Sequence, residues 1–341
     1  MSTMEFVSLD VTYRCNYSCL HCFNSSGSPK SFCKEMTEEE LLNVGEQLAE
    51  FEPMSFCVCG GEPLLRAETV FKLGKKVKEK ATQTSVNLVT NGYLMTDEIA
   101  SKLKESNFNL VQVSLDGISN DTHNWLRQND AALDRAIQAI RILVKHGFYT
   151  GVACAPTKKN LKEIPQVIAK AYELGVKMFR IQPLMLLGRA RENLKDYMLD
   201  EYEYFSLVET LDEEKHKYPE MEISWGDPIQ HIADIRTKDN KVNFVSVNAF
   251  GKMVLSPYIP VDFGDLKVHS LREYVENGYL EINKSAFVKR LFQMIDDSST
   301  LEVHEKNDRL PILGVEENIH MDIMEKSVEE YDRILLEKYF G

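Results

Sequence analysis

The segment "EFVSLDVTYRCNYSCLHCFNSSG", residues 5–27, places three cysteines directly after a short apolar run. The run over residues 5–12 predicts a β-strand. Cys15, Cys19 and Cys22 follow in a loop of small polar and aromatic residues, where three thiols would make poor core packing. The segment therefore predicts a strand whose C-terminal end carries a metal-binding group of thiols.

Length and composition predict an ordinary globular protein. The chain has 341 residues, 43% hydrophobic and 27% charged, which suffices for a large core. The N-terminus lacks the basic start of a signal peptide, and no stretch approaches about 18 consecutive apolar residues. We therefore expect a cytoplasmic location and no membrane partner. The net charge of −13 argues against a nucleic-acid partner.

Two kinds of metal site fit three clustered cysteines. Three thiolates can hold three irons of a cubane iron–sulfur cluster and leave the fourth iron open to another ligand. A structural zinc site needs a fourth protein ligand, which here would be His21 or Cys33. His21 adjoins Cys22 in sequence, which is awkward for joint chelation. The spacing favours the iron–sulfur cluster and leaves zinc as the alternative.

Beyond the cysteines, amphipathic segments alternate with short apolar runs. Helices are predicted within residues 37–51, 66–81, 96–107, 130–147 and 161–175, and strands within 55–63, 85–92, 110–117, 149–157 and 177–185. Thr37 and Glu40 form a helix-start signature. Six strands, each but the last followed by a helix, predict an α/β fold with a parallel sheet, most economically a partial (β/α)6 TIM-like barrel.

The pattern becomes less regular after about residue 200. We place the barrel in residues 1–215, a smaller α+β C-terminal extension in 216–290 and a C-terminal helical segment in 291–341. The extension is expected to contain a hairpin around Gly251 and a helix beginning near Ser270, and residues 319–340 are expected to be helical.

Unusual residues follow the predicted strands. The C-terminal ends of parallel strands meet at one edge of a sheet. These unusual residues are therefore expected to lie near the cysteines. They are Gly60-Gly61-Glu62-Pro63, Thr90-Asn91-Gly92, Ser114-Leu115-Asp116-Gly117 and Gln182. Taken singly, most of these motifs are ordinary turns.

Taken together and in this order, Cys15-x-x-x-Cys19-x-His21-Cys22 and the three strand-end motifs resemble the radical S-adenosylmethionine (radical SAM) enzymes. In that family the open iron binds the amino and carboxylate groups of S-adenosylmethionine. An electron from the cluster cleaves the sulfonium, and the resulting 5′-deoxyadenosyl radical abstracts hydrogen from the substrate. The resemblance implies one 4Fe–4S cluster on the three cysteines, S-adenosyl-L-methionine as cofactor, and an external one-electron reductant such as flavodoxin or ferredoxin.

The resemblance also implies roles for single residues. Gly60 and Gly61 would let the backbone approach a ligand, and Glu62 would face the ammonium group of the cofactor. His21 would place a flat ring near the adenine. Hydrogen bonds to the ribose or methionine portions are implied for the strand-end residues Asn91, Ser114 and Asp116, with Gln182 as a further cofactor-binding candidate. Arg127 resembles an arginine near the cofactor carboxylate, with a solvated surface arginine as the alternative.

The segment "FRIQPLMLLGRARE", residues 179–192, resembles the radical SAM branch with a cysteine-rich SPASM or twitch extension, which includes many peptide-modifying enzymes. Here Ser256 stands where a cysteine is expected, and no cysteine follows Cys154. The resemblance therefore implies a degenerate extension without auxiliary clusters, which still covers the barrel mouth.

The leading hypothesis is modification of a ribosomally synthesised peptide by epimerisation or crosslinking. Cys154 is the candidate catalytic residue, expected to face the barrel interior and donate hydrogen to a substrate radical, with Cys59 second. Because the barrel begins near Met1, peptide recognition is expected to use the C-terminal region or a partner. The alternatives are a small-molecule substrate, such as a tetrapyrrole side chain or a sugar, and a zinc-stabilised binding module.

Overall fold

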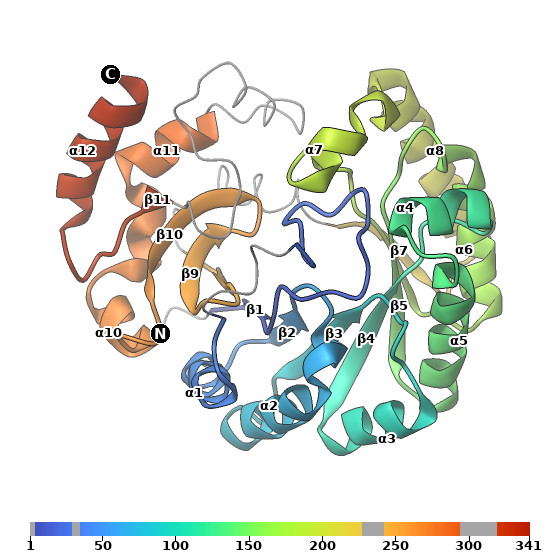
Figure 1. Ribbon diagram of the computed structural model, residues 1–341, viewed down its shortest axis with the longest axis horizontal. Coiled ribbons are helices and arrows are strands. Elements are labelled where there is room, and N and C mark those ends of the chain that lie inside the picture. The colour runs from blue at the N-terminus through green and yellow to red at the C-terminus, as the bar shows by residue number, and fades with distance from the viewer. Residues whose placement is uncertain (1–3, 29–34, 227–241, 294–318) are drawn as a thin grey trace.

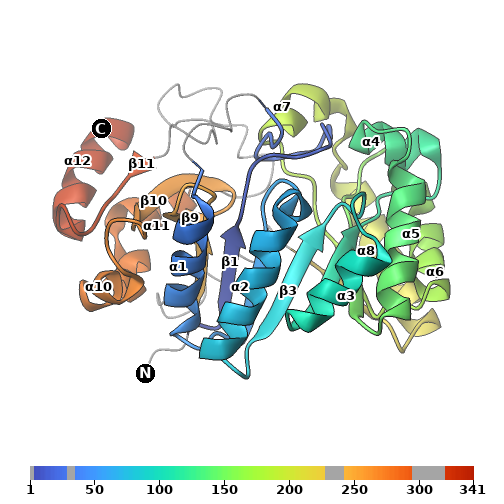
Figure 2. The same ribbon diagram turned by 60° about the horizontal axis from the view of Figure 1, so that its bottom comes forward.

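The computed structural model describes residues 4–28, 35–226, 242–293 and 319–341. Within these ranges one mixed sheet has the strand order β11-β10-β9-β8-β1-β2-β3-β4-β5-β6-β7. Helices cover the outer side of its parallel part, and the cysteine segment lies with α7 (Arg189–Asn193) at one end of the strands (Figures 1 and 2).

The parallel part is a series of strand and helix units, which confirms the predicted α/β fold. Its elements are β1 (Phe6–Asp10), α1 (Glu38–Ala49), β2 (Ser55–Cys59), α2 (Ala67–Lys80), β3 (Ser85–Thr90), α3 (Asp97–Glu105), β4 (Phe108–Ser114), α4 (Trp125–Arg127), α5 (Ala132–Lys145), β5 (Tyr149–Cys154), α6 (Ile164–Glu173) and β6 (Met178–Ile181). Neighbouring strands from β1 to β6 pair in parallel. The Thr37 and Glu40 capping box at the start of α1 is present.

A seventh parallel strand follows the six that the sequence predicts. Helix α8 (Glu201–Lys217) leads to β7 (Glu222–Trp225), which pairs in parallel with β6. The strand is only four residues long, too short for a clear alternating pattern. It falls in the range 216–290, and the division of the chain at 215 and 290 stays a prediction.

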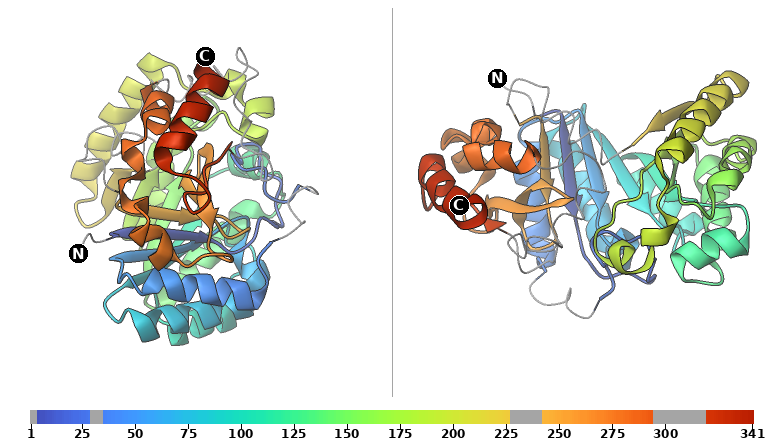
Figure 3. Two further views of the ribbon diagram at one scale, coloured as in Figure 1. Left: turned by 90° about the vertical axis from the view of Figure 1, so that its left-hand side faces the viewer. Right: turned by 90° about the horizontal axis from the view of Figure 1, so that it is seen from above.

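The C-terminal extension continues the same sheet from the opposite edge (Figure 3). After β7, the extension and the C-terminal segment from residue 291 together comprise β8 (Phe244–Val247), β9 (Lys252–Ser256), β10 (Ile259–Asp265), α10 (Leu271–Glu276), α11 (Ala286–Gln293), β11 (Ile319–His320) and α12 (Val328–Phe340). β8 pairs in parallel with β1, whereas β9 pairs in antiparallel fashion with both β8 and β10. The extension is thus joined to the barrel through backbone hydrogen bonds.

Two details of the extension can be compared with the sequence analysis. The hairpin at Gly251 and the helix capped by Ser270 lie where they were expected. The tail differs, because residues 319 and 320 pair with β10 and the helix begins only after the cap at Ser327. None of the described helices combines the length and the apolar character needed to cross a membrane.

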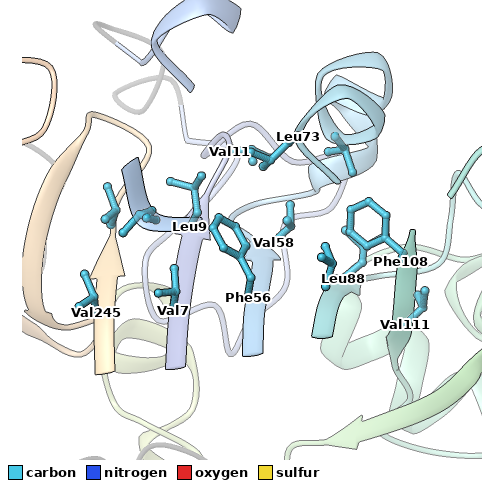
Figure 4. Close-up of a cluster of buried hydrophobic side chains, with 14 of the residues drawn as sticks. Val7, Leu9, Val11, Phe56, Val58, Leu73, Leu88, Phe108, Val111 and Val245 are labelled. Atoms are coloured by element: carbon cyan, nitrogen blue, oxygen red, sulfur yellow. The ribbon is translucent and has the colours of Figure 1, made fainter. Parts of the chain in front are cut away.

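The two faces of the parallel sheet differ sharply in chemistry. The face toward the helices is apolar, and its side chains pack with Leu73 of α2 (Figure 4). This outer face includes Val7, Leu9, Phe56, Val58, Leu88, Val111, Val113, Val152 and Phe179. The opposite face, toward the barrel interior, is mainly polar or small, and includes Ser8, Asp10, Cys57, Cys59, Asn87, Gln112, Ser114, Ala153 and Arg180.

Cys154 lies on the outer face, so its expected position in the barrel interior is wrong. Side chains alternate along a strand, and neighbouring strands pair Ser114 with Ala153 and Cys154 with Ile181. Ala153 therefore faces inward, whereas Cys154 is fully buried in the core beneath the helices. Burial raises the pKa of the Cys154 thiol. Its place at a strand end was predicted correctly, but its face was not.

We predict that Cys154→Ala lowers stability and leaves catalysis per folded molecule unchanged. Removal of one buried sulfur from a packed core should cost about 1–2 kcal/mol in the free energy of unfolding. Urea unfolding measures this loss, and Cys154→Ser should cost more because it places a hydroxyl in an apolar site. A stable alanine variant that still cleaves cofactor but forms no product would instead restore the hydrogen-donor role.

Candidate active site

The cysteine segment rests directly on the turn that follows β2. The amide of Gly61 donates to the carbonyl of Thr12 at 2.7 Å, and the amide of Glu62 donates to the carbonyl of Arg14 at 2.9 Å. A Cβ atom on Gly60 or Gly61 would overlap these same carbonyl oxygens, and Gly60 has a φ of +132°. The close approach that these glycines permit in this structure is to the chain leading into Cys15.

The sulfur atoms of the three cysteines face N–H donors. The amide of Tyr17 donates to Cys15 Sγ at 3.4 Å, and the amide of Ser26 donates to Cys22 Sγ at 3.3 Å. Burial raises the pKa of Cys15 to about 12, and the neighbouring thiols add to this effect. N–H groups directed at sulfur stabilise thiolates bound to iron, so this arrangement fits an iron–sulfur cluster.

The same segment holds several buried polar atoms that lack a partner. Among the described residues these are Asn16 Nδ2, Tyr17 Oη and His21 Nδ1. Buried polar atoms without hydrogen bonds cost free energy unless a ligand pairs with them. Their grouping around the cysteines fits a polar cofactor beside the cluster.

The zinc hypothesis requires a fourth ligand from His21 or Cys33. Cys33 lies outside the described residues. Within the described ranges, no three His, Cys, Asp or Glu side chains are arranged to hold a single metal ion.

Glu62 joins the ends of β2 and β3. Its carboxylate accepts hydrogen bonds from the amide of Leu64 at 3.0 Å, the hydroxyl of Thr90 at 2.9 Å and the amide of Asn91 at 2.8 Å. Burial raises the pKa of Glu62, although these bonds oppose the shift. Contact with the cofactor ammonium stays a prediction for this residue.

Asn91 connects β3 to the cysteine segment. Its amide nitrogen donates to Asn16 Oδ1 at 2.8 Å and lies 3.9 Å from Cys15 Sγ. The side chain is buried, and its oxygen accepts from the amide of Tyr93. Asn91 therefore lies beside the expected cluster, as its strand-end position predicts.

A buried ion pair joins Asp116 after β4 to Arg127 in α4. Arg127 Nε donates to Asp116 Oδ2 at 2.6 Å, and Asp116 Oδ1 accepts from the amide of Ala155 at 2.9 Å. Burial alone would raise the pKa of Asp116, but the Arg127 guanidinium holds this pKa at about 2. Arg127 is 9% exposed and extends toward Cys19 Sγ at 4.0 Å. It is therefore not a surface arginine.

Two histidines beside this ion pair stay neutral near pH 7. Burial and the nearby Arg127 lower the pKa of His21 to about 3. Burial lowers the pKa of His123 to about 4, and His123 Nδ1 accepts from the amide of Asp116 at 3.0 Å. His21 therefore offers a neutral ring, which suits packing rather than acid or base chemistry near pH 7.

A cavity of about 90 Å³ brings several predicted residues together. Its walls include His21, Phe23, Asp116, Arg127, Ala153, Gln182 and Tyr258. Ser114 faces inward beside Ala153, one strand away. Glu62 and Asn91 lie on the Cys15 side of the site, and Cys154 takes no part in it.

Gly188 and Arg189 hold the cysteine segment from the opposite side, a role that the sequence analysis missed. Arg189 Nε donates to the carbonyl of Cys19 at 2.9 Å, and a second guanidinium nitrogen donates to the carbonyl of Ser26 at 2.8 Å. A Cβ atom on Gly188 would overlap the carbonyl groups of Cys22 and Phe23. The only signal in the sequence was a Gly-Arg pair after an apolar strand.

The C-terminal extension reaches the cavity through the turn between β9 and β10. The ring of Tyr258 lies 4.9 Å from the ring of Phe23, measured between centroids, and Tyr258 lines the cavity. Ser256, which occupies the position expected for a cysteine, accepts a hydrogen bond from the amide of Tyr258 at 3.3 Å. Ser256 thus stabilises the turn that brings Tyr258 to the site.

These features agree with the match of residues 9–181 to the Radical SAM superfamily, and the chain belongs to that family. The family uses a 4Fe–4S cluster with S-adenosylmethionine, and the thiols, donors and unpartnered atoms described above fit both groups.

Relatives of two kinds match the sequence. The AdoMet-dependent heme synthase of Methanosarcina barkeri is 27% identical over 294 residues, covering 80% of this chain and 82% of that protein. The sporulation killing factor maturation protein SkfB of Bacillus subtilis is 29% identical over 230 residues. That match covers 66% of this chain and 51% of SkfB, so the chain spans about half the length of that relative.

Solved structures support the fold. Streptococcus suis SuiB bound to S-adenosylmethionine has a TM-score of 0.69 at 14% identity, covering 84% of this chain and 68% of SuiB. SuiB bound to its precursor peptide SuiA has a TM-score of 0.68 at the same identity, and that match covers 82% of this chain and 66% of SuiB.

We predict that Arg189→Lys weakens cluster binding while the protein stays folded. Lysine keeps the charge but cannot hold the carbonyls of Cys19 and Ser26 with one planar fork. Loss of a supporting contact of this kind typically costs about ten- to a hundredfold in metal affinity. The rate at which a chelator removes iron from the reconstituted protein measures the effect. Arg141→Lys on the exposed side of α5 is the matched control, and equal rates in both variants would contradict the role of Arg189.

Proposed function

We propose that this chain uses radical SAM chemistry to modify a ribosomally synthesised peptide, by epimerisation or crosslinking. One matched relative is a heme synthase and another is a maturation protein for a killing factor, so kinship alone leaves tetrapyrrole and peptide substrates open. The choice between them rests on the chemistry of the barrel interior.

The observation that carries the proposal is the inner wall of β1 to β6, where hydroxyl and amide side chains outnumber the charged residues Asp10 and Arg180. Ser8, Asn87 and Gln112 face inward from β1, β3 and β4. In the structure Ser8 donates to Ser246 and Asn87 donates to Ser55, so a peptide would exchange with these bonds. Hydroxyl and amide groups complement the N–H and C=O groups of an extended peptide. A tetrapyrrole presents a broad apolar face with several carboxylates, which calls for apolar walls and several cations. Among the described residues on the inner faces of β1 to β6, the cation is Arg180.

When bound, the cluster and S-adenosylmethionine supply a carbon radical that takes a hydrogen atom from the substrate. In this proposal Cys15, Cys19 and Cys22 hold one cluster, and Arg127 holds the cofactor carboxylate while Asp116 fixes the orientation of its guanidinium. Since no cysteine follows Cys154, the chain supplies no thiols for an auxiliary cluster in the extension. An external one-electron reductant of the flavodoxin or ferredoxin class completes the system.

The interior also bears on how a substrate radical is resolved. Cys59 pairs in register with Asp10 on the inner face, and a hydrogen bond with Cys57 together with burial raises the pKa of its thiol. A protonated thiol is the form that can donate a hydrogen atom. For epimerisation we therefore assign the donor role to Cys59, the second candidate from the sequence, in place of Cys154.

The proposed function predicts a change in peptide mass or stereochemistry that depends on cofactor cleavage. The test uses anaerobically reconstituted protein, S-adenosylmethionine, a low-potential reductant and each short peptide encoded beside the gene. Mass spectrometry and chiral amino-acid analysis should detect a modified peptide, with 5′-deoxyadenosine formed in proportion. The Cys19→Ala variant is the control without a complete cluster site.

A parallel incubation with a tetrapyrrole tests the alternative substrate class. Coproporphyrin III incubated under the same conditions should remain unchanged. Conversion of coproporphyrin III, with every peptide unmodified, would contradict the peptide proposal and favour the tetrapyrrole alternative.

A further inference from the structure

Arg180 is a cation on the inner wall of the barrel, in the middle of β6. Strand pairing places it in one row with Ala153 of β5 and Ser224 of β7, and Ala153 lines the cavity beside Asp116 and Arg127. Neighbouring strands lie about 4.8 Å apart, so the Cα of Arg180 is one strand spacing from the cavity wall. Gln182, which directly follows the end of β6, lines the cavity itself.

The guanidinium of Arg180 has no partner among the described residues. No hydrogen bond, ion pair or ring contact engages it there, and the side chain is half-buried. Arg127, by contrast, has its carboxylate partner in Asp116. The inner face also carries Asp10 in β1 and Glu222 in β7, but among the described residues neither forms an ion pair with Arg180. A half-buried cation that no described carboxylate contacts is unfavourable unless an anion pairs with it.

Arg180 is bordered by small residues on β5, on β7 and directly after β7, and one of them is a glycine. Its neighbours in the row, Ala153 and Ser224, are small. Gly226 follows β7, and a Cβ atom there would lie 3.4 Å from Arg180 Nε and 3.0 Å from Gln182 Cγ. The glycine therefore keeps a side chain away from both polar groups.

We propose that Arg180 binds a carboxylate of the peptide substrate inside the barrel and so positions the peptide beside the cofactor cavity. This inference rests on the proposed function and adds a recognition element to it. A guanidinium matches a carboxylate through two parallel N–H···O bonds, and the serine hydroxyl of Ser224 can donate a third. A single guanidinium balances one carboxylate, in keeping with an acidic side chain or a peptide C-terminus.

The test measures the reactivity of Arg180 with phenylglyoxal in the reconstituted protein, using site-resolved mass spectrometry. Arg180 should react, whereas Arg127, held by Asp116, should resist. The probes are N-acetylglutamate α-amide for a side-chain carboxylate, N-acetylalanine for a terminal carboxylate, and N-acetylglutamine α-amide as the neutral control. At about twice the dissociation constant of a carboxylate probe, modification of Arg180 should slow about threefold.

A second measurement follows binding of the same probes by saturation-transfer NMR. Arg180→Gln should lower the affinity for the carboxylate probe about ten- to a hundredfold, because a charge-assisted pair is lost. Arg141→Gln, which alters an exposed arginine of α5, is the matched control and should bind the probe as the wild type does. The carboxylate probe that protects Arg180 better from phenylglyoxal shows whether the recognised anion is a side-chain carboxylate or a peptide C-terminus.

Several outcomes would overturn the proposal. Equal protection by the glutamine and glutamate amides would show that charge is not recognised. Protection by S-adenosylmethionine alone would assign Arg180 to the cofactor, and protection only by coproporphyrin III would assign it to a tetrapyrrole. None of these labelling experiments requires peptide modification, so a failure of the proposed function remains distinguishable from a failure of carboxylate binding.

Discussion

The backbone contact between Gly60-Gly61 and residues 12–14 is the constraint on which the active site depends. Two hydrogen bonds join these segments at a separation that excludes any side chain at either glycine. Asn91 and Arg189 add contacts to Asn16 and Cys19 from β3 and from the segment after β6. Anchors distant in sequence thus hold one short loop, and they place three sulfur atoms and the ion pair of Asp116 around a common region. Hydrogen bonds to the ligand-bearing backbone orient metal ligands without touching the metal.

The apolar outer face of the sheet stabilises the fold, so that the inner face can be polar. Helices cover the outer face and bury large side chains such as Phe56 and Phe108, each contributing about 1.5–3 kcal/mol of transfer free energy. The inner face then need not be apolar, and it can present hydroxyl, amide and guanidinium groups to a substrate. The extension contributes to both functions, since β8 prolongs the sheet beside β1 and Tyr258 closes part of the cavity over Phe23.

Local patterns in the sequence were sufficient to predict the main architecture and the position of the thiols after the first strand. Thr37 and Glu40 marked a helix start that the structure contains, and the parallel strands lie where apolar runs end in polar motifs. Residues whose roles depend on a face or on distant partners were harder to predict. Cys154 was placed at the correct strand end but on the wrong side, because several successive residues of β5 are buried and conceal the alternation. The contacts of Arg189, and the fact that no described residue pairs with Arg180, depend on three-dimensional neighbours that no local pattern contains.

The most direct test of the central claim is iron and acid-labile sulfide analysis of anaerobically reconstituted protein, together with electron paramagnetic resonance of the reduced sample. One cluster on three cysteines predicts about four irons and four sulfides per chain, and a signal that changes when S-adenosylmethionine is added. A colourless protein with one zinc per chain, or one with about eight irons, would contradict this account of the site.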